Sequence, residues 1–550
     1  MTVAASRKRG TGANDVRNNR LDWTLLLPAS AVWPIDEVLV LGGSEAMAQS
    51  LLDHGLARSW RRPRGPHDRN TLVVAWDDCP LAVGQIAGHV APGGLLYMEV
   101  DRRHPGRRLL GPRSVQRDLA RSGCRLVSAH IVTPDFADPR RYLPIDHAQA
   151  VRWHLRALFM AGTPIMRALR GGLVGVLATP IAGPVLRLVM LRYTVIATAA
   201  DDHSPPLGVP MARGDERVIV VTSGYDQGSR AVVLPFGPGD PTPRFAVKVA
   251  STSKTATATL REHERLVQLH ATLPARTARA LPRPIAVYSL ANRTACVQSC
   301  APGPSMNATV GLWGRPFSAK IRDLDVVVDW LTEFACATRV DVSVAERNWA
   351  LIYDEVAAIM QLPSEVVDFL SEAQAIARST NLARVAVHQH YDVGPWNVHI
   401  DGTTPMLLDW ETDDLRPADC LGPPLGDVLY LIIYWYFLTS NTKSEDAEEE
   451  AIVRLFATAA APDSYVVAAR TAINRALVPF GLDRSVIPAV LAAVWAERAL
   501  YTSRRRAALG TPIEVGRSRP EAFLRTLARV MPTMCDIMVG DHAAWVEPRP

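Results

Sequence analysis

HYDVGPWN, at His390–Asn397, followed by LLDWE, at Leu407–Glu411, is the stretch of sequence that decides the fold. The alternating residues after Trp396 predict a strand, the letters DGTTP predict a turn, and the apolar residues before Asp409 predict a second strand. If this hairpin is symmetric, Asn397 lies across from Asp409. The stretch therefore predicts that an amide oxygen and a carboxylate meet at one end of a hairpin.

Such a pair of oxygen ligands suits a Mg²⁺ ion that bridges the protein to nucleotide phosphates. Asp392 lies in the loop just before the hairpin, where it can accept the proton of an attacking hydroxyl. The alternative is an accidental match in a hairpin whose polar residues merely cap a turn. By composition, the three fixed residues of H-x-D-x-x-x-x-N recur by chance in roughly one of fifty chains of this length. Asp409, at the spacing that a hairpin requires, makes an accidental match less favoured still.

The pattern resembles the catalytic core of the aminoglycoside phosphotransferase and choline kinase group, which are relatives of the protein kinases. The resemblance implies that Asp392 is the catalytic base, that Asn397 and Asp409 hold magnesium, and that His390 tethers the catalytic loop. Protein kinases carry Arg after this His and D-F-G at the second position. Tyr391 and the letters D-W-E therefore favour the branch that acts on small molecules.

A kinase-like fold requires a β-rich lobe upstream, with a glycine-bearing turn that covers the phosphates. Two strands are predicted at 218–222 and 231–235, and Ser223, Gly224 and Gly228 lie in the turn between them. Turns of this composition are also common in ordinary hairpins. We expect these three residues to lie near the phosphates of ATP.

Lys248 lies in the apolar strand FAVKV and needs an anionic partner, because burying an unpaired charge costs free energy. The following helix offers Glu262, which the resemblance identifies as that partner, and Glu264 as a second choice. The alternative is an edge-strand lysine that reaches water. Further along, Gln298 and Cys300 resemble the hinge residues whose backbone groups bind adenine. The resemblance covers residues 217 to 506.

The N-terminal part alternates strands and helices, which predicts a doubly wound parallel sheet. The apolar strands at 37–41, 71–77 and 95–100, with a P-G-G turn before the last, resemble a class I S-adenosylmethionine-dependent methyltransferase. The cofactor signature departs from that family. The Gly42-Gly43 turn lacks the G-x-G spacing and the acidic residue at the strand end, and Trp60-Arg61-Arg62 is basic. We therefore expect a degenerate scaffold, with S-adenosylmethionine binding left open.

The fold class expected for the 550 residues is α/β plus α+β: a Rossmann-like sheet followed by a bilobal kinase-like fold. The expected divisions are a basic tail at 1–20, a methyltransferase-like domain at 21–200, a linker at 201–216, a kinase-like N-lobe at 217–300 and a helical C-lobe at 301–550. The net charge of +5 predicts no nucleic-acid partner. Seven scattered cysteines indicate a cytoplasmic protein. The apolar segment 160–200 predicts buried helices or, alternatively, peripheral membrane contact.

Together these features predict an ATP- and Mg²⁺-dependent phosphotransferase whose acceptor is a hydroxyl of a small molecule or glycan. Two other functions stay open. One is a non-catalytic pseudokinase joined to a methyltransferase-like binding module. The other is a bifunctional methyltransferase and kinase that acts on a lipid-linked glycan.

Overall fold

The computed structural model forms two compact units. The sheet unit comprises the described parts of Ala4–His263 and Arg283–Cys300, and the helical unit comprises those of Glu264–Pro282 and Ala301–Pro550. The residues described are 22–28, 33–66, 68–103, 110–158, 164–199, 216–222, 230–251, 253–290, 293–311, 315–341, 349–360, 362–410, 420–457, 462–508 and 519–539.

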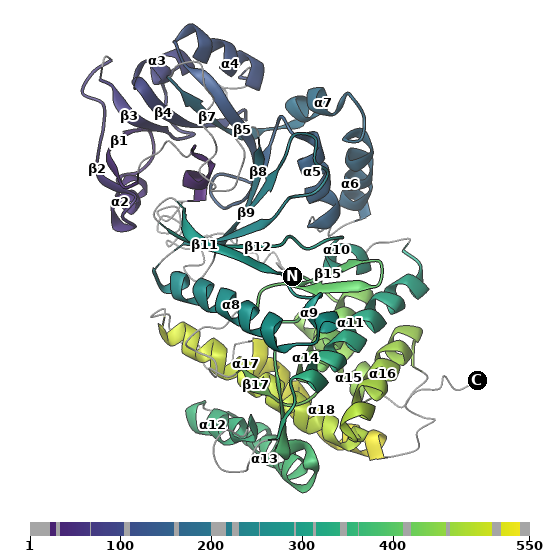
Figure 1. Cartoon of the computed structure of the whole chain (residues 1–550). Coiled ribbons are helices and arrows are strands. Elements are labelled where there is room, and N and C mark those ends of the chain that lie inside the picture. Colours follow the sequence, from purple (N-terminus) through teal and green to yellow (C-terminus); the bar gives the residue numbers. More distant parts are fainter. Residues whose placement is uncertain are drawn as a thin grey trace. The chain divides into compact units, whose positions relative to one another are not determined.

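The described strands of the sheet unit form one mixed twelve-stranded sheet, in the order β11-β12-β10-β9-β8-β6-β5-β7-β4-β3-β1-β2 (Figure 1). With its covering helices, this sheet gives the chain a mixed α/β fold. The strands are β1 (Ile35–Leu41), β2 (Ala57–Arg61), β3 (Asn70–Ala75), β4 (Val90–Asp101), β5 (Arg125–Pro134), β6 (Pro139–Pro144), β7 (Arg192–Thr198), β8 (Arg217–Val221), β9 (Arg230–Phe236), β10 (Ala246–Ala250), β11 (Pro284–Leu290) and β12 (Arg293–Gln298).

One half of the sheet is largely parallel. β2, β1, β3 and β4 run parallel to their neighbours, while β7 lies antiparallel between β4 and β5. The continuous apolar runs of β1 and β3 suit this arrangement, because strands covered on both faces have no polar side to show water. Trp23, Val40 and Tyr97 belong to the core on one face, and Leu39 and Met98 to the core on the other.

The other half is antiparallel, from β8 to β12, and it joins the first half through β6 and β8. Tyr142 pairs with Val220, and the Thr222 N–H donates to the Arg140 carbonyl at 2.8 Å. The linker expected at 201–216 falls between β7 and β8, and residues 201–215 lie outside the described part of the chain. The strands on either side of it belong to the same sheet.

Helices cover this sheet at several places. α5 (Ala148–Ala157), α6 (Pro164–Val176) and α7 (Ala182–Val189) pack against its antiparallel half, where Ile219 and Phe236 share a core with Leu186. Leu169 and Ile181 of the 160–200 segment are 61% and 58% exposed, so the segment is only partly buried. The helices are η2 (Asp22–Leu26), α2 (Glu45–Asp53), α3 (Val83–Gly88), α4 (Pro112–Arg121), α5 (Ala148–Ala157), α6 (Pro164–Val176), α7 (Ala182–Val189) and α8 (Ser253–Thr272), whose last residues belong to the helical unit.

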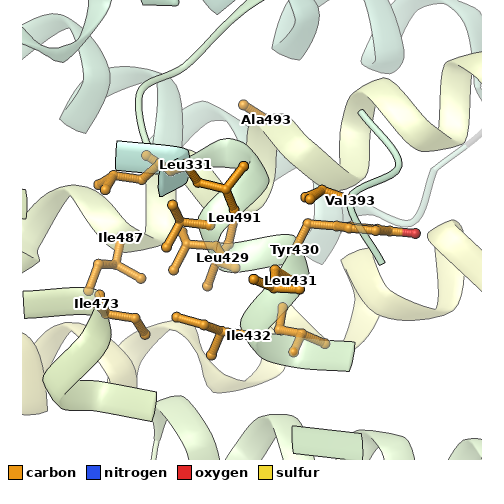
Figure 2. Packing of buried hydrophobic residues seen from close by; sticks show 14 of the residues in the cluster. Leu331, Val393, Leu429, Tyr430, Leu431, Ile432, Ile473, Ile487, Leu491 and Ala493 are labelled. Carbon is orange, nitrogen blue, oxygen red and sulfur yellow. The ribbon is translucent and has the colours of Figure 1, made fainter. Parts of the chain in front are cut away.

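The helical unit is built around α14 (Gly426–Thr439), which is apolar on all sides and buried along nearly its whole length. Leu429, Leu431 and Ile432 pack there against residues of several other helices (Figure 2). The surrounding helices are α9 (Ala275–Ala278), α10 (Met306–Val310), α11 (Phe317–Ala337), η4 (Trp349–Leu351), α12 (Ile352–Ile359), α13 (Ser364–Ser379), η5 (Asn381–Arg384), α15 (Glu445–Phe456), α16 (Ser464–Leu477), η6 (Val478–Phe480), η7 (Arg484–Val486), α17 (Ile487–Ala508) and α18 (Arg519–Val539).

Two small sheets complete this unit. β15 (Val398–Asp401) and β16 (Thr404–Leu407) form the hairpin expected from the sequence, and β14 (Val385–His388) lies between β13 (Val340–Asp341) and β17 (Leu421–Gly422). Among the described residues, no single helix has the length and apolar composition needed to span a membrane. Ser464–Phe480 and Arg484–Ala507, bent by 103°, pass that test only as a pair.

Candidate functional site

The loop between β14 and β15 is anchored by a buried carboxylate. Asp427, in the first turn of α14, accepts the backbone N–H of His390 at 2.6 Å and that of Tyr391 at 3.0 Å. Arg265 donates to the carbonyl of Gln389 at 2.7 Å. Tyr391 has a φ of 66°, a conformation that costs free energy for a residue with a side chain and persists only where its surroundings fix it. These contacts hold the loop rigidly at its first residues.

His390 joins the two parts of the motif. Its Nε2 donates to the carbonyl of Leu408 at 2.7 Å, and its Nδ1 accepts the Asp392 N–H at 3.3 Å. Burial lowers the pKa of His390 to about 4, against a weaker upward influence of Asp392, so the ring is neutral near pH 7. Because both ring nitrogens are used in this way, His390 serves to position Asp392 beside the residue that precedes Asp409.

The Asp392 carboxylate receives four side-chain donors. Tyr430 and Arg498 donate to Oδ1 at 3.0 and 3.2 Å. Asn397 and Trp396 donate to Oδ2 at 3.1 and 3.3 Å. The side chain is still 36% exposed, so it is both fixed and reachable. A held, accessible carboxylate is the geometry expected of a base that orients a hydroxyl.

Tyr430 and Arg498 were not identified from the sequence. Arg498 of α17 also donates to the Tyr391 carbonyl and lies over the Tyr430 ring, 4.2 Å from its centre. Burial raises the pKa of Tyr430 well above its usual value, so the phenol stays a donor. Burial alone lowers the pKa of Arg498, but Tyr430 and Asp392 outweigh it and raise that pKa. One available signal was the Glu497-Arg498 pair, the charged residues in the otherwise apolar stretch Ile487–Leu500.

The expected pairing of Asn397 with Asp409 is wrong by one residue. Val398 pairs with Leu407, and the Leu408 N–H donates to the Asn397 carbonyl at 2.8 Å, so Asn397 lies across from Leu408. The cause is a two-residue turn, in which Gly402 adopts a φ of 61°, instead of the longer symmetric turn that was expected. Asp409 follows with a φ of 60°.

The donor set at this end of the hairpin fits Mg²⁺. The Asn397 amide nitrogen is directed to the carbonyl and Oδ2 of Asp392, which turns Oδ1 toward other ligands. Asp409 is half-buried, and its charge acts on both His390 and His399. An amide oxygen and a carboxylate, completed by phosphate oxygens and water, are ligands that Mg²⁺ accepts. Among the described residues, no group of three or more His, Cys, Asp or Glu gathers as a metal site.

In the sheet unit, Lys248 and Glu262 form a buried ion pair. Lys248 Nζ lies 2.6 Å from Glu262 Oε1, and their side chains are 6% and 3% exposed. Arg230, at the start of β9, donates to the other oxygen of Glu262 and is equally buried. The exposed Glu264, the second choice from the sequence, is not the partner shown by this contact.

The structure says less about the other residues expected to bind the nucleotide. Ser223, Gly224 and Gly228 lie outside the described residues. Gln298 ends β12 and pairs with Ala246 of β10, while Cys300 is half-buried against the core under α5 and α7.

The Gly42-Gly43 turn was the candidate site for S-adenosylmethionine, and the residues around it do not fit that cofactor. Asp78 accepts the Gly43 N–H at 2.6 Å, and Arg62 donates to the carbonyls of both glycines. A Cβ added at Gly43 would lie 2.2 Å from the Trp76 ring. The glycines are therefore needed for close packing of the protein's own side chains, and Asp78 and Arg62 already take the backbone groups that a cofactor would use there.

No family model matches the chain, and no curated protein matches it in sequence. Among solved structures, it is similar to a mutant of aminoglycoside 2′-phosphotransferase-IIIa in complex with GDP, with 13% sequence identity and a TM-score of 0.27. The match covers 51% of this chain and 89% of that chain. A likeness this distant establishes no shared reaction, so the side chains around Asp392 carry the function proposed below.

Proposed function

We propose that the protein is a phosphotransferase that moves the γ-phosphoryl group of ATP to a hydroxyl of a small molecule or glycan. The observation that carries this proposal is the Asp392 carboxylate, held by four side-chain donors and still exposed to an incoming hydroxyl. His390 ties this loop to the segment of Asp409, so the base and the two magnesium ligands belong to one rigid piece.

The chemistry assigned to the loop is an in-line displacement. The acceptor oxygen forms a bond to the γ-phosphorus while the bond from that phosphorus to the β–γ bridging oxygen breaks. ADP leaves with the electron pair, and the acceptor proton passes to Asp392. Asn397 and Asp409 would hold the Mg²⁺ ion, which supplies positive charge against the phosphates. Because the transition state is loose, precise orientation by Asp392 matters more than strong basicity.

Lys248 is proposed to steady the phosphates, with Glu262 orienting its ammonium group. The support is their buried ion pair, since a desolvated lysine on a strand is held ready for an anion. The order of the antiparallel strands β8 to β12, with α8 between β10 and β11, also supports a kinase-like lobe. The parallel strands, with β7 antiparallel between β4 and β5, support a methyltransferase-like scaffold without its cofactor.

The test uses the full chain, ATP and a panel of alcohols, with product detected by ³¹P nuclear magnetic resonance. Asp392→Asn is expected to lower transfer by roughly a hundredfold or more while ATP with Mg²⁺ still raises the melting temperature. Asp329→Asn, on an exposed part of α11, is the matched control and should be silent. Unchanged transfer in Asp392→Asn would refute the assignment.

A second candidate is a pseudokinase, and one observation favours it. Four side chains donate to the Asp392 carboxylate, a number that would also suit a group that serves only to hold the fold together. In that case ATP with Mg²⁺ would not raise the melting temperature, whereas a true site stabilises strongly only when both are present.

Peripheral membrane contact through 160–200 and a cytoplasmic location are further proposals. The exposed Leu169 and Ile181 support the first.

A further inference from the structure

An apolar pocket of the helical unit adjoins the groups that hold Asp392. Its lining includes Ile352 of α12, Pro423 after β17, and Ala493 and Val494 of α17, together with Tyr391. The cavity volume is about 60 Å³. An engineered cavity of about 150 Å³ holds benzene, so this pocket has room for a smaller aliphatic group.

Two side chains that line the pocket also contact the proposed base, Asp392. Tyr430 and Arg498 line it, and both donate to Asp392 Oδ1. In Figure 2 the Tyr430 side chain points away from the labelled leucines and isoleucines of the core. A molecule that fills the pocket therefore lies against the two side chains that orient the base.

The lining as a whole suits an aliphatic group better than a polycation. Asp427 is 7% exposed, and its two oxygens accept the backbone N–H groups of His390 and Tyr391. Arg498 contributes a positive charge, which repels an ammonium group placed beside it. Among the described residues that line the pocket, Glu497 is the carboxylate outside the loop anchor. An apolar group gains free energy here by leaving water, whereas an ammonium group loses its hydration.

We propose that this pocket takes the apolar end of the acceptor, and that the acceptor is an alcohol carrying a compact aliphatic group rather than a polycationic sugar. This inference rests on the proposed phosphotransferase function, because it names the substrate class of that site. The aliphatic group occupies the space between Ile352 and Ala493, and the hydroxyl reaches Asp392 past Tyr430.

The experiment compares 3-methylbutan-1-ol with glycerol and kanamycin as acceptors for the full chain with ATP and Mg²⁺. The branched alcohol is expected to be the best of the three by kcat/KM. Ala493→Leu narrows the pocket and should raise the KM for the branched alcohol roughly tenfold, since about two methylene groups lose their burial. The KM for ATP should not change. Ala507→Leu, at an exposed position of the same helix, is the matched control.

Ile352→Ala gives a second, opposite perturbation if Ala493→Leu fails to fold. Because it enlarges the pocket, it should shift the preference toward longer branched alcohols. Kanamycin as the best acceptor, or a KM for the branched alcohol that neither variant changes, would overturn the inference while leaving the phosphotransferase intact. Absence of both transfer and ATP-dependent stabilisation would instead overturn the proposed function.

Discussion

Lys248 and Arg230 share the Glu262 carboxylate, and this arrangement predicts that substitutions of Glu262 and Lys248 lower the free energy of unfolding by different amounts. Glu262 contacts both cations, and the three side chains are 3%, 6% and 7% exposed, so the cluster is almost dry. Replacing Glu262 with Ala leaves two buried cations facing each other without their common partner. Removing one member of a buried pair costs about 3–5 kcal/mol, so this substitution should fall at the upper end of that range.

Lys248→Met should cost less, about 1–2 kcal/mol, because Glu262 keeps Arg230 as its partner. The order of destabilisation is therefore Glu262→Ala well above Lys248→Met. A simple pair of Lys248 and Glu262 would predict similar costs for the two substitutions, because each would leave one buried charge unpaired.

Urea denaturation followed by circular dichroism measures the free energies of unfolding. Hydrogen exchange of peptides from β10 and α8 assigns the loss to the sheet unit. Glu264→Ala, an exposed glutamate on the same helix, is the control and should stay within about 0.5 kcal/mol of the wild type. A cost for Lys248→Met equal to or above that for Glu262→Ala would refute the idea of a shared carboxylate.

Three further predictions follow from other contacts. Asp427→Asn replaces the carboxylate that accepts two backbone N–H groups with a neutral amide. The free energy of unfolding should fall by about 1–3 kcal/mol, which calorimetry measures, and phosphoryl transfer should fall in the ³¹P assay. Burial lowers the pKa of His130 and His390 to about 4 and of His154 to about 3, so their contribution to stability is complete above about pH 6.5. This contribution is lost as the pH falls through 4, by about 3 kcal/mol each for His130 and His390. A series of urea midpoints that does not change between pH 7 and pH 4 would contradict this prediction. S-adenosylmethionine should give no calorimetric binding heat, since Arg62 occupies the glycine turn; measurable binding would show that the guanidinium moves aside.

Local chemistry could be predicted from the sequence, and distant partners could not. Lys248 and Glu262 lie 14 residues apart on a strand and the helix that follows it, so the charge of one demands the other. The loop with Asp392 and Asn397 was likewise readable from spacing. Arg498 lies 106 residues from Asp392 along the chain, and only packing brings it there. The pairing of β6 with β8 could not be predicted from the sequence either, and it joins the two expected domains in one sheet. An exposed strand edge can pair with any strand of fitting register, so the sequence does not specify this partner.

The Asp392 network explains how one carboxylate can be both anchored and available. An ionised carboxylate offers about four lone-pair sites, and four side-chain donors occupy them. On the proposed function, an acceptor hydroxyl that reaches the exposed part of the carboxylate would therefore compete with one of these donors. Tyr430 is 2% exposed, whereas the Arg498 side chain is 20% exposed, lines the pocket and sits at 3.2 Å.

Arg498 is the partly exposed donor that also lines the pocket, so an acceptor seated there as proposed would contact that same guanidinium. On the proposed function, an acceptor bound there would supply the hydroxyl that replaces this donor on the carboxylate.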